Sequence, residues 1–266
     1  MRGVGGLVFR RWWFVRLLSA PPDEPGRRLP ERERRELVLR EWEVLRERLA
    51  RIAAERVTAA GELFRAAELR LPAEASASGA ESPADSAART AYLWALEAYE
   101  AAGRLLDQAD DPHTDLPDLA AAVVLAEQAV ERLAAAHTLY AGARPAPLAV
   151  RCFYNPLHGP AVPAAAPDRP GKKQRQRPTR GAREAAADRR PACRSCRRAI
   201  LAGETPDVLP ALLPAKAAGR RTGPVLVPYY TVPQQWSPWS ATACGAYDPD
   251  APALVLRGAH HRHPPH

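Results

Sequence analysis

Three of the four cysteines and one histidine fall in two short segments that could hold a metal ion. Cys152 and His158 are separated by five residues, and Cys193 and Cys196 form a C-x2-C pair. Structural Zn²⁺ takes four thiolate and imidazole ligands in a tetrahedron. A C-x2-C turn can supply two thiolates to one ion, and the wider C-x5-H loop can supply the other two ligands. The sequence therefore predicts a structural Zn²⁺ site made of Cys152, His158, Cys193 and Cys196.

The same cysteines allow other interpretations. Only one pair has the standard spacing, and 34 residues separate His158 from Cys193. Cys193 and Cys196 could instead form a disulfide, or all the cysteines could be free thiols that act as small apolar side chains. Cys244 is an alternative ligand in place of His158. A nucleophilic role for Cys244 would require a neighbouring base, and its local sequence supplies none.

A set of short motifs carries a resemblance to a known family. These motifs are Cys-Phe-Tyr-Asn-Pro-Leu-His-Gly at 152–159, the C-x2-C pair, Val-Pro-Tyr-Tyr at 227–230, Trp-Ser-Ala-Thr at 239–242, and the helical segments 99–107 and 116–120. Over roughly residues 90–258 they resemble a bacterial protein family with no established activity. The resemblance implies a helical half followed by a zinc-binding module, and no particular chemistry. The family pattern leads us to expect a Gly-rich turn near residue 244, so the cysteine found there argues against Cys244 as a ligand.

Composition and charge bound the architecture. A chain of 266 residues suggests one large or two modest domains. Only 6% of the residues are aromatic and 28 are proline, which predicts limited large cores and irregular backbone in the second half. Residues 72–150 carry four basic and 12 acidic side chains, whereas residues 169–198 carry 12 basic and two acidic ones. The overall charge of +8 therefore describes a basic patch and not a uniformly basic surface.

The first 30 residues predict a basic, Trp-bearing segment and a linker. The longest apolar run, Trp12 to Val15, is far shorter than the roughly 18 residues that a spanning helix requires. Arginines also interrupt any signal-peptide core. Residues 1–20 could therefore lie in the interface of an anionic membrane, and a disordered or locally packed terminus is the alternative. Residues 21–30 form the Pro- and Gly-containing linker.

Helical periodicity dominates residues 31–142. Apolar side chains recur every three to four residues over 31–71, and Pro72 is expected to end that helix. A helical hairpin is predicted within 84–140, with Asp115 as the N-cap of its second helix. Alanines between the larger apolar residues of this hairpin permit close helix approach. The fold class is therefore α+β and mostly α, with a helical bundle preceding a smaller module.

The smaller module is predicted at 150–258, as a zinc-ribbon-like or treble-clef-like unit with short strands. Residues 160–190 are a low-complexity basic insertion for which we expect disorder or an extended loop. The other expected elements are a short helix at 197–203 and strands at 225–232 and 253–256. A His-rich tail at 259–266 is expected to be solvated.

The leading hypothesis for function is a non-enzymatic, zinc-stabilised helical scaffold or adaptor. Four protein ligands fill the coordination sphere of the ion and leave no position for a substrate water. Such a protein would be cytoplasmic, peripheral to the membrane through residues 1–20, and would bind a protein partner or itself through its helices. The alternative is nucleic-acid binding through the basic segment 169–198. Thiol redox chemistry or another enzymatic activity is the third hypothesis. It ranks last because the usual βαβ context of a redox C-x2-C pair is missing.

Overall fold

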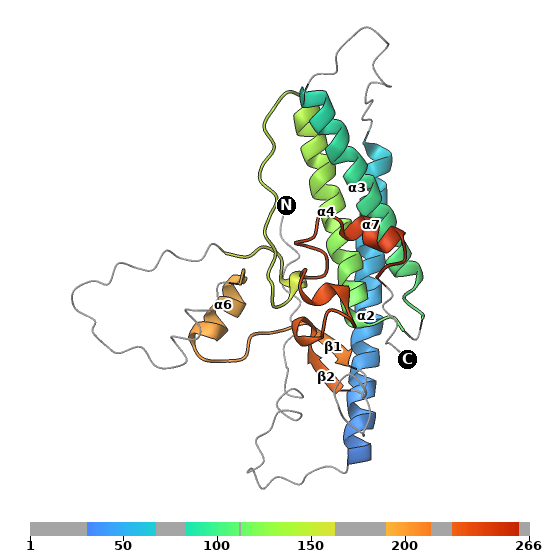
Figure 1. Cartoon of the computed structure of the whole chain (residues 1–266), viewed down its shortest axis with the longest axis vertical. Coiled ribbons are helices and arrows are strands. Elements are labelled where there is room, and N and C mark those ends of the chain that lie inside the picture. Colours follow the sequence, from blue (N-terminus) through green and yellow to red (C-terminus); the bar gives the residue numbers. More distant parts are fainter. Residues whose placement is uncertain (1–30, 68–82, 112, 163–189, 214–224, 261–266) are drawn as a thin grey trace, which may run out of the picture.

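The computed structural model describes residues 31–67, 83–111, 113–162, 190–213 and 225–260. The helices in this part of the chain are α2 (Glu31–Ala66), α3 (Pro83–Asp107), α4 (Leu116–Tyr140), α6 (Arg194–Leu201) and α7 (Ala251–Leu256). Two strands, β1 (Pro210–Leu213) and β2 (Val225–Pro228), pair antiparallel, with Pro210 opposite Pro228. Figure 1 shows α2, α3 and α4 side by side, with the strands beside α2 and α6 standing apart from the bundle. The predicted α+β, mostly α architecture is confirmed.

Helix α4 lies against both other long helices, and alanine allows the contact to be close. Its first three turns are buried on almost every side, from Leu116 to Ala126. The face of α3 that is buried in the bundle is mostly alanine, and its members are Ala88, Ala91, Ala95, Ala98, Ala101, Ala102 and Leu105. Small side chains let two helix backbones approach, and burial of these faces supplies the apolar contribution to folding.

Helix α2 follows its predicted apolar stripe but ends earlier than expected. Val38, Trp42 and Leu49 are buried, and Trp42 and Leu49 belong to the main core. The helix was predicted to continue to residue 71, and it ends at Ala66. Phe64 packs on two tyrosines of α3, and the next two residues are exposed, so tertiary burial does not support a further turn. Residues 68–82, including Pro72, lie outside the described part of the chain.

The second half corrects several sequence-based expectations. The apolar run 253–256, predicted as a strand, belongs to α7, where Ala251, Pro252 and Val255 are buried. A short apolar run cannot be assigned by periodicity alone, and the proline at the start of this one suits the first turn of a helix. The strand predicted at 225–232 stops at Pro228 and continues as a 3-10 turn, η2 (Tyr229–Thr231). The short helix predicted at 197–203 begins earlier, at Arg194, because Cys193 caps it.

The structure describes only part of the C-terminal tail and of the basic insertion, and it does not describe the first 30 residues. His260, expected in a solvated tail, is 5% exposed, and its Nε2 lies 3.0 Å from Oε1 of Gln108. This buried contact contradicts the prediction for that residue. Residues 261–266, the segment 1–30 with its predicted membrane contact, and residues 163–189 of the predicted disordered insertion lie outside the described residues. Among the described helices, none combines the length and apolarity needed to cross a membrane.

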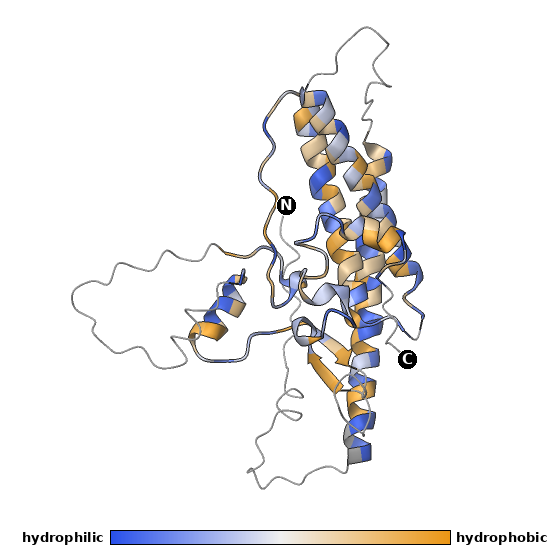
Figure 2. Cartoon of the chain, viewed as in Figure 1, coloured by the Kyte–Doolittle hydropathy of each residue, from blue (hydrophilic) through white to orange (hydrophobic). Residues whose placement is uncertain are grey.

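Two carboxylates at the start of α4 join the bundle to the second half of the chain. Asp115 caps α4 and accepts hydrogen bonds from Trp42 Nε1 of α2 (2.8 Å) and from the backbone N–H of Leu212 in β1 (2.7 Å). Asp118 completes the capping box and accepts from Trp239 Nε1 at 2.7 Å. The two strands are apolar throughout, as their orange colour in Figure 2 shows, and β1 packs against α4. The Asp115 carboxylate therefore ties three elements that are distant in sequence.

Replacing Asp115 tests this junction. In Asp115→Ala, the N–H groups of Trp42, Leu116 and Leu212 lose their common acceptor. Because an unsatisfied buried donor costs free energy, we expect the free energy of unfolding to fall by about 3 kcal/mol in urea denaturation. Asp110→Ala, at an exposed aspartate between α3 and α4, is the matched control and should change it by less than about 0.5 kcal/mol. Equal effects of the two substitutions would contradict the assignment.

The pH dependence of the same variant gives a second test. Burial raises the pKa of Asp115 from 3.8 to about 6, against the opposing hydrogen bonds from Trp42 and the backbone. The folded chain therefore holds a proton that the unfolded chain releases, so this group stabilises the fold less as pH rises between these values. The destabilisation caused by Asp115→Ala should be greater at about pH 4 than at about pH 7. If the destabilisation by Asp115→Ala instead increased with pH, the raised pKa of Asp115 would be contradicted.

Candidate metal centre

The four predicted ligands come together in the structure. One ligand atom from each of Cys152, His158, Cys193 and Cys196 lies within 4.8 Å of every other. Nδ1 of His158 is 3.5 Å from Cys193 Sγ and 3.3 Å from Cys196 Sγ. Metal–sulfur bonds of about 2.3 Å and metal–nitrogen bonds of about 2.0 Å in a tetrahedron place neighbouring S and N atoms about 3.5 Å apart. The separations therefore suit one tetrahedral ion.

The Cys152–His158 loop is a closed turn. The N–H of Cys152 donates to the carbonyl of Gly159 at 3.1 Å, at the two ends of the loop. Within it, the side chain of Asn155 caps a 3-10 turn, η1 (Pro156–His158), and Gly159 has a φ of 78°. That left-handed conformation favours glycine, and proline suits the first position of the turn. These local preferences point the Cys152 and His158 side chains to the same site.

The second ligand pair lies at the beginning of α6. Cys193 is the N-cap residue, and its Sγ accepts from the N–H of Cys196 at 3.5 Å. The hydroxyl of Ser195 is 3.1 Å from the same sulfur. Hydrogen bonds from the thiols of Cys152 and Cys196 lower the pKa of Cys193. The site therefore favours a thiolate at Cys193, which is the form that binds a metal.

The thiol of Cys196 has the opposite tendency. Its pKa is raised, first through its hydrogen bonds with Cys152 and Cys193 and then by burial. Two thiolates in contact repel one another, so the thiols share protons unless a cation neutralises them. All four cysteines of the chain are free thiols, so the alternative of a Cys193–Cys196 disulfide is not what the structure contains.

Backbone pairing brings the two ligand segments together across the intervening residues. The N–H of Phe153 donates to the carbonyl of Pro191 at 2.8 Å, and the N–H of Val162 donates to Ala192 at 3.0 Å. These contacts lie outside the β1–β2 sheet, whose strands carry none of the four ligands. The ligand-bearing backbone is therefore held by isolated bridges.

Asp207 is a component of the site that the sequence reasoning missed. Its Oδ2 lies 3.1 Å from Nε2 of His158, on the side of the ring away from the sulfur atoms. A carboxylate in this position keeps the proton on Nε2 and leaves Nδ1 as the metal-binding atom. Although burial opposes it, the hydrogen bonds with Asp207, Cys152 and Cys193 raise the pKa of His158 to about 11. The sequence spacing of Asp207 gives no signal of this role. Asp207 lies beside His158 only because of the path that the chain takes after α6.

Arg190 packs on three aromatic rings next to the site, and one of them, Tyr154, lies in the same small core as the three clustered cysteines. The guanidinium carbon of Arg190 lies 5.0 Å from the ring centre of Phe153, 5.3 Å from that of Tyr154 and 5.2 Å from that of Tyr230. Cation–π contacts of this kind are attractive. Arg190 precedes Cys193 by three residues, so the contacts hold the second ligand segment against the first.

The ligand segment is also anchored to α4. The buried side chain of Arg151 donates to Glu127 Oε2 at 2.6 Å and to Glu131 Oε1 at 3.2 Å. The hydroxyl of Tyr247 donates to the carbonyl of Arg151. Cys152 thus follows a residue that is fixed both to the bundle and to the C-terminal segment.

Cys244 lies outside the cluster. It is fully buried in the main core, together with Trp239 and residues of α4, and burial raises its pKa well above the ordinary value. Its φ of 54° is a left-handed conformation that residues other than glycine rarely adopt. His158, and not Cys244, is therefore the fourth member of the cluster.

Comparison with known proteins yields no matching protein family, no matching curated protein and no matching solved structure. The resemblance to a bacterial family of unassigned activity accordingly stays a prediction.

Asp207 provides the first test of the site. In Asp207→Ala the ring of His158 loses the acceptor that fixes its orientation and tautomer. We expect metal affinity, measured by competition with a chromophoric chelator, to fall about 10- to 100-fold. Asp207→Asn retains an acceptor oxygen without the charge, so its effect should be intermediate. Glu204→Ala, at a neighbouring exposed carboxylate, is the control, and an affinity for Asp207→Ala equal to that of the control would contradict the role.

Proposed function

We propose that this chain is a structural zinc protein, in which a closed Cys3His centre orders the second half of a helical scaffold. The observation that carries the proposal is the convergence of four ligand atoms, one from each predicted residue, within 4.8 Å of one another. Three sulfur atoms and one imidazole nitrogen complete a tetrahedron without help from water or substrate.

The donor set favours zinc over the other common divalent metals. Thiolate ligands disfavour Mg²⁺ and Ca²⁺, which take oxygen ligands, and a tetrahedral sulfur-rich site suits Zn²⁺. The carboxylate of Asp207 behind His158 is the partner that histidine ligands of zinc usually have. Because every ligand position is filled by protein, the centre supports a structural role and not the activation of water.

The small core around the ligands explains why an ion would be needed. Its buried members are Cys152, Tyr154, Ala192, Cys193, Cys196 and Val208, half of them ligands. Apolar burial on this scale contributes little to stability, whereas Zn²⁺ binding to a site absent from the unfolded chain contributes its binding free energy to folding. On this basis we propose a scaffold or adaptor role, which a structural and non-catalytic metal supports.

The partners of such a scaffold remain predictions. Binding to a protein partner or to itself would use the helices. Contact with an anionic membrane would use residues 1–20. Nucleic-acid binding would use 169–198, of which the structure describes only residues 190–198.

Metal analysis of matched cysteine variants tests the proposal. The wild-type chain should contain about one Zn²⁺ per molecule, and a chelator should lower its melting temperature. Cys193→Ala should lose the metal, because two thiolates and one imidazole bind it much more weakly. Cys244→Ala removes a buried thiol and retains the same backbone conformation, so it should keep a full complement of metal.

Alkylation separates a metal role from thiol redox chemistry. Cys152, Cys193 and Cys196 should resist an alkylating reagent until a chelator removes the ion. Purified protein without zinc, thiols that react at once, or equal metal loss in Cys193→Ala and Cys244→Ala would each overturn the proposal.

A further inference from the structure

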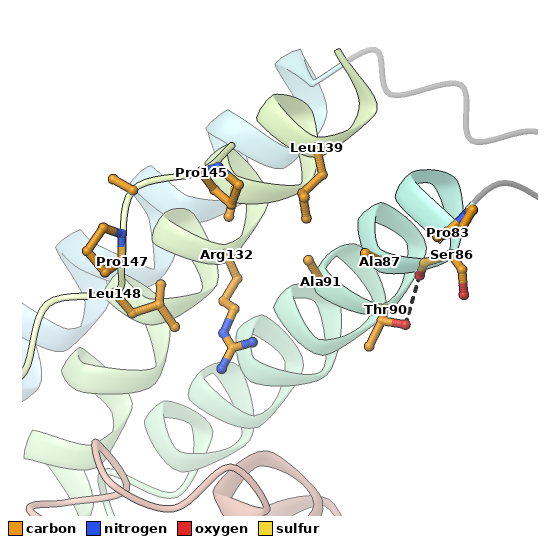
Figure 3. Close-up of a pocket in the computed structure, with 12 residues that line it drawn as sticks. Pro83, Ser86, Ala87, Thr90, Ala91, Arg132, Leu139, Pro145, Pro147 and Leu148 are labelled. Carbon is orange, nitrogen blue, oxygen red and sulfur yellow. Dashed lines mark hydrogen bonds between the residues drawn. The ribbon is translucent and has the colours of Figure 1, made fainter. Parts of the chain in front are cut away.

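An apolar cleft lies at the end of the α3–α4 hairpin that is away from the turn joining the two helices. A cleft of about 680 Å³ is bounded by α3, by the last turns of α4 and by the extended segment 145–148 (Figure 3). This volume falls in the range of small-molecule sites. Most of its lining is apolar, contributed by Pro83, Ala87, Ala91, Ala135, Leu139, Pro145, Ala146, Pro147 and Leu148.

One charged side chain reaches into this apolar cleft. Figure 3 shows Arg132 extending from α4 into the space between α4 and α3, with Leu139 further along the same helix. The remaining polar lining consists of Ser86 and Thr90, and the Thr90 hydroxyl donates to the carbonyl of Ser86 at 2.9 Å. Among the described lining residues Arg132 is the only charged one, so a cation at one end of an apolar wall gives the cleft a definite polarity.

The guanidinium of Arg132 is only partly satisfied. It packs over the ring of Trp94, with 4.5 Å between the guanidinium carbon and the ring centre. Its Nε is buried and has no hydrogen-bond partner among the described residues, and in that part of the chain no carboxylate forms an ion pair with Arg132. Burial lowers its pKa. Placing a half-buried guanidinium without an anion costs free energy, and a bound carboxylate would recover it through paired N–H···O bonds.

We propose that this cleft binds a small amphipathic carboxylate, with its carboxylate on Arg132 and its hydrocarbon chain along the apolar wall toward Leu139. Seven residues of α-helix advance about 10 Å, so the wall between Arg132 and Leu139 matches an acyl chain of about eight carbons. The chain lies against Ala87 and Ala91, where small side chains leave room beside α3. A cationic or neutral ligand of the same length would leave the guanidinium without an anion.

Octanoate binding to the full-length protein, followed by isothermal titration calorimetry, tests the site. We expect octanoate to bind the wild-type chain, and octan-1-ol and octyltrimethylammonium to bind at least about tenfold more weakly, because they lack the anion. Arg132→Met keeps an apolar stem without the charge and should weaken octanoate binding about 10- to 100-fold. Arg132→Lys keeps the charge without the planar guanidinium, so its octanoate affinity should lie between those of the wild type and Arg132→Met.

Arg144→Met is the matched control, because Arg144 is exposed and does not line the cleft. Circular dichroism melting of each variant establishes that it is folded. Absence of octanoate binding to wild type, equal binding of octanoate and octan-1-ol, or unchanged octanoate binding in Arg132→Met would each overturn the proposal. The test is independent of the metal centre, since the zinc content of these variants should not change.

Discussion

The carboxylate of Asp115 is the contact on which the arrangement of the two halves depends. It accepts hydrogen bonds from α2 and from β1 while it caps α4. The effect extends to the candidate metal centre through a backbone hydrogen bond, because the N–H of Leu209, just before β1, donates to the carbonyl of Tyr154 in the first ligand segment. A buried carboxylate is costly unless its oxygens are satisfied, so the three elements must be in place together.

The two halves of the chain are stabilised by different kinds of interaction. The helices are stabilised by burial of alanine, leucine and valine faces in a continuous core, which also includes Trp239 and Val255 from the C-terminal segment. Around Cys152 the buried core is small, and pairing of short segments, cation–π contacts and the ligand cluster take its place. Apolar area sets how much a core can stabilise, and the Pro-rich ligand segments bury little of it. A metal ion is the device that suits such a region.

Helix α4 serves both sites. Glu127 and Glu131 hold Arg151 and thereby the first ligand segment. Arg132, the next residue, has no carboxylate partner among the residues that the structure describes, and it lines the cleft against α3. Successive helical residues lie about 100° apart, so one helix can present an anionic face to the metal module and a cation to a cleft. The proposed carboxylate site and the proposed zinc site therefore use different faces of one element and can be tested separately.

Local pattern alone determined the helical character of the first half, the N-cap at Asp115, and the four ligand candidates, because helix periodicity, capping and Cys/His spacing are short-range properties. It did not identify α7, because a short apolar run suits a strand and a helix equally until its packing partner is known. It also could not find Asp207, the carboxylate junction or the position of Arg132 in the cleft. Those depend on which distant segments meet, and only the tertiary structure decides that, because burial and hydrogen-bond satisfaction belong to the assembled chain and not to any stretch of it.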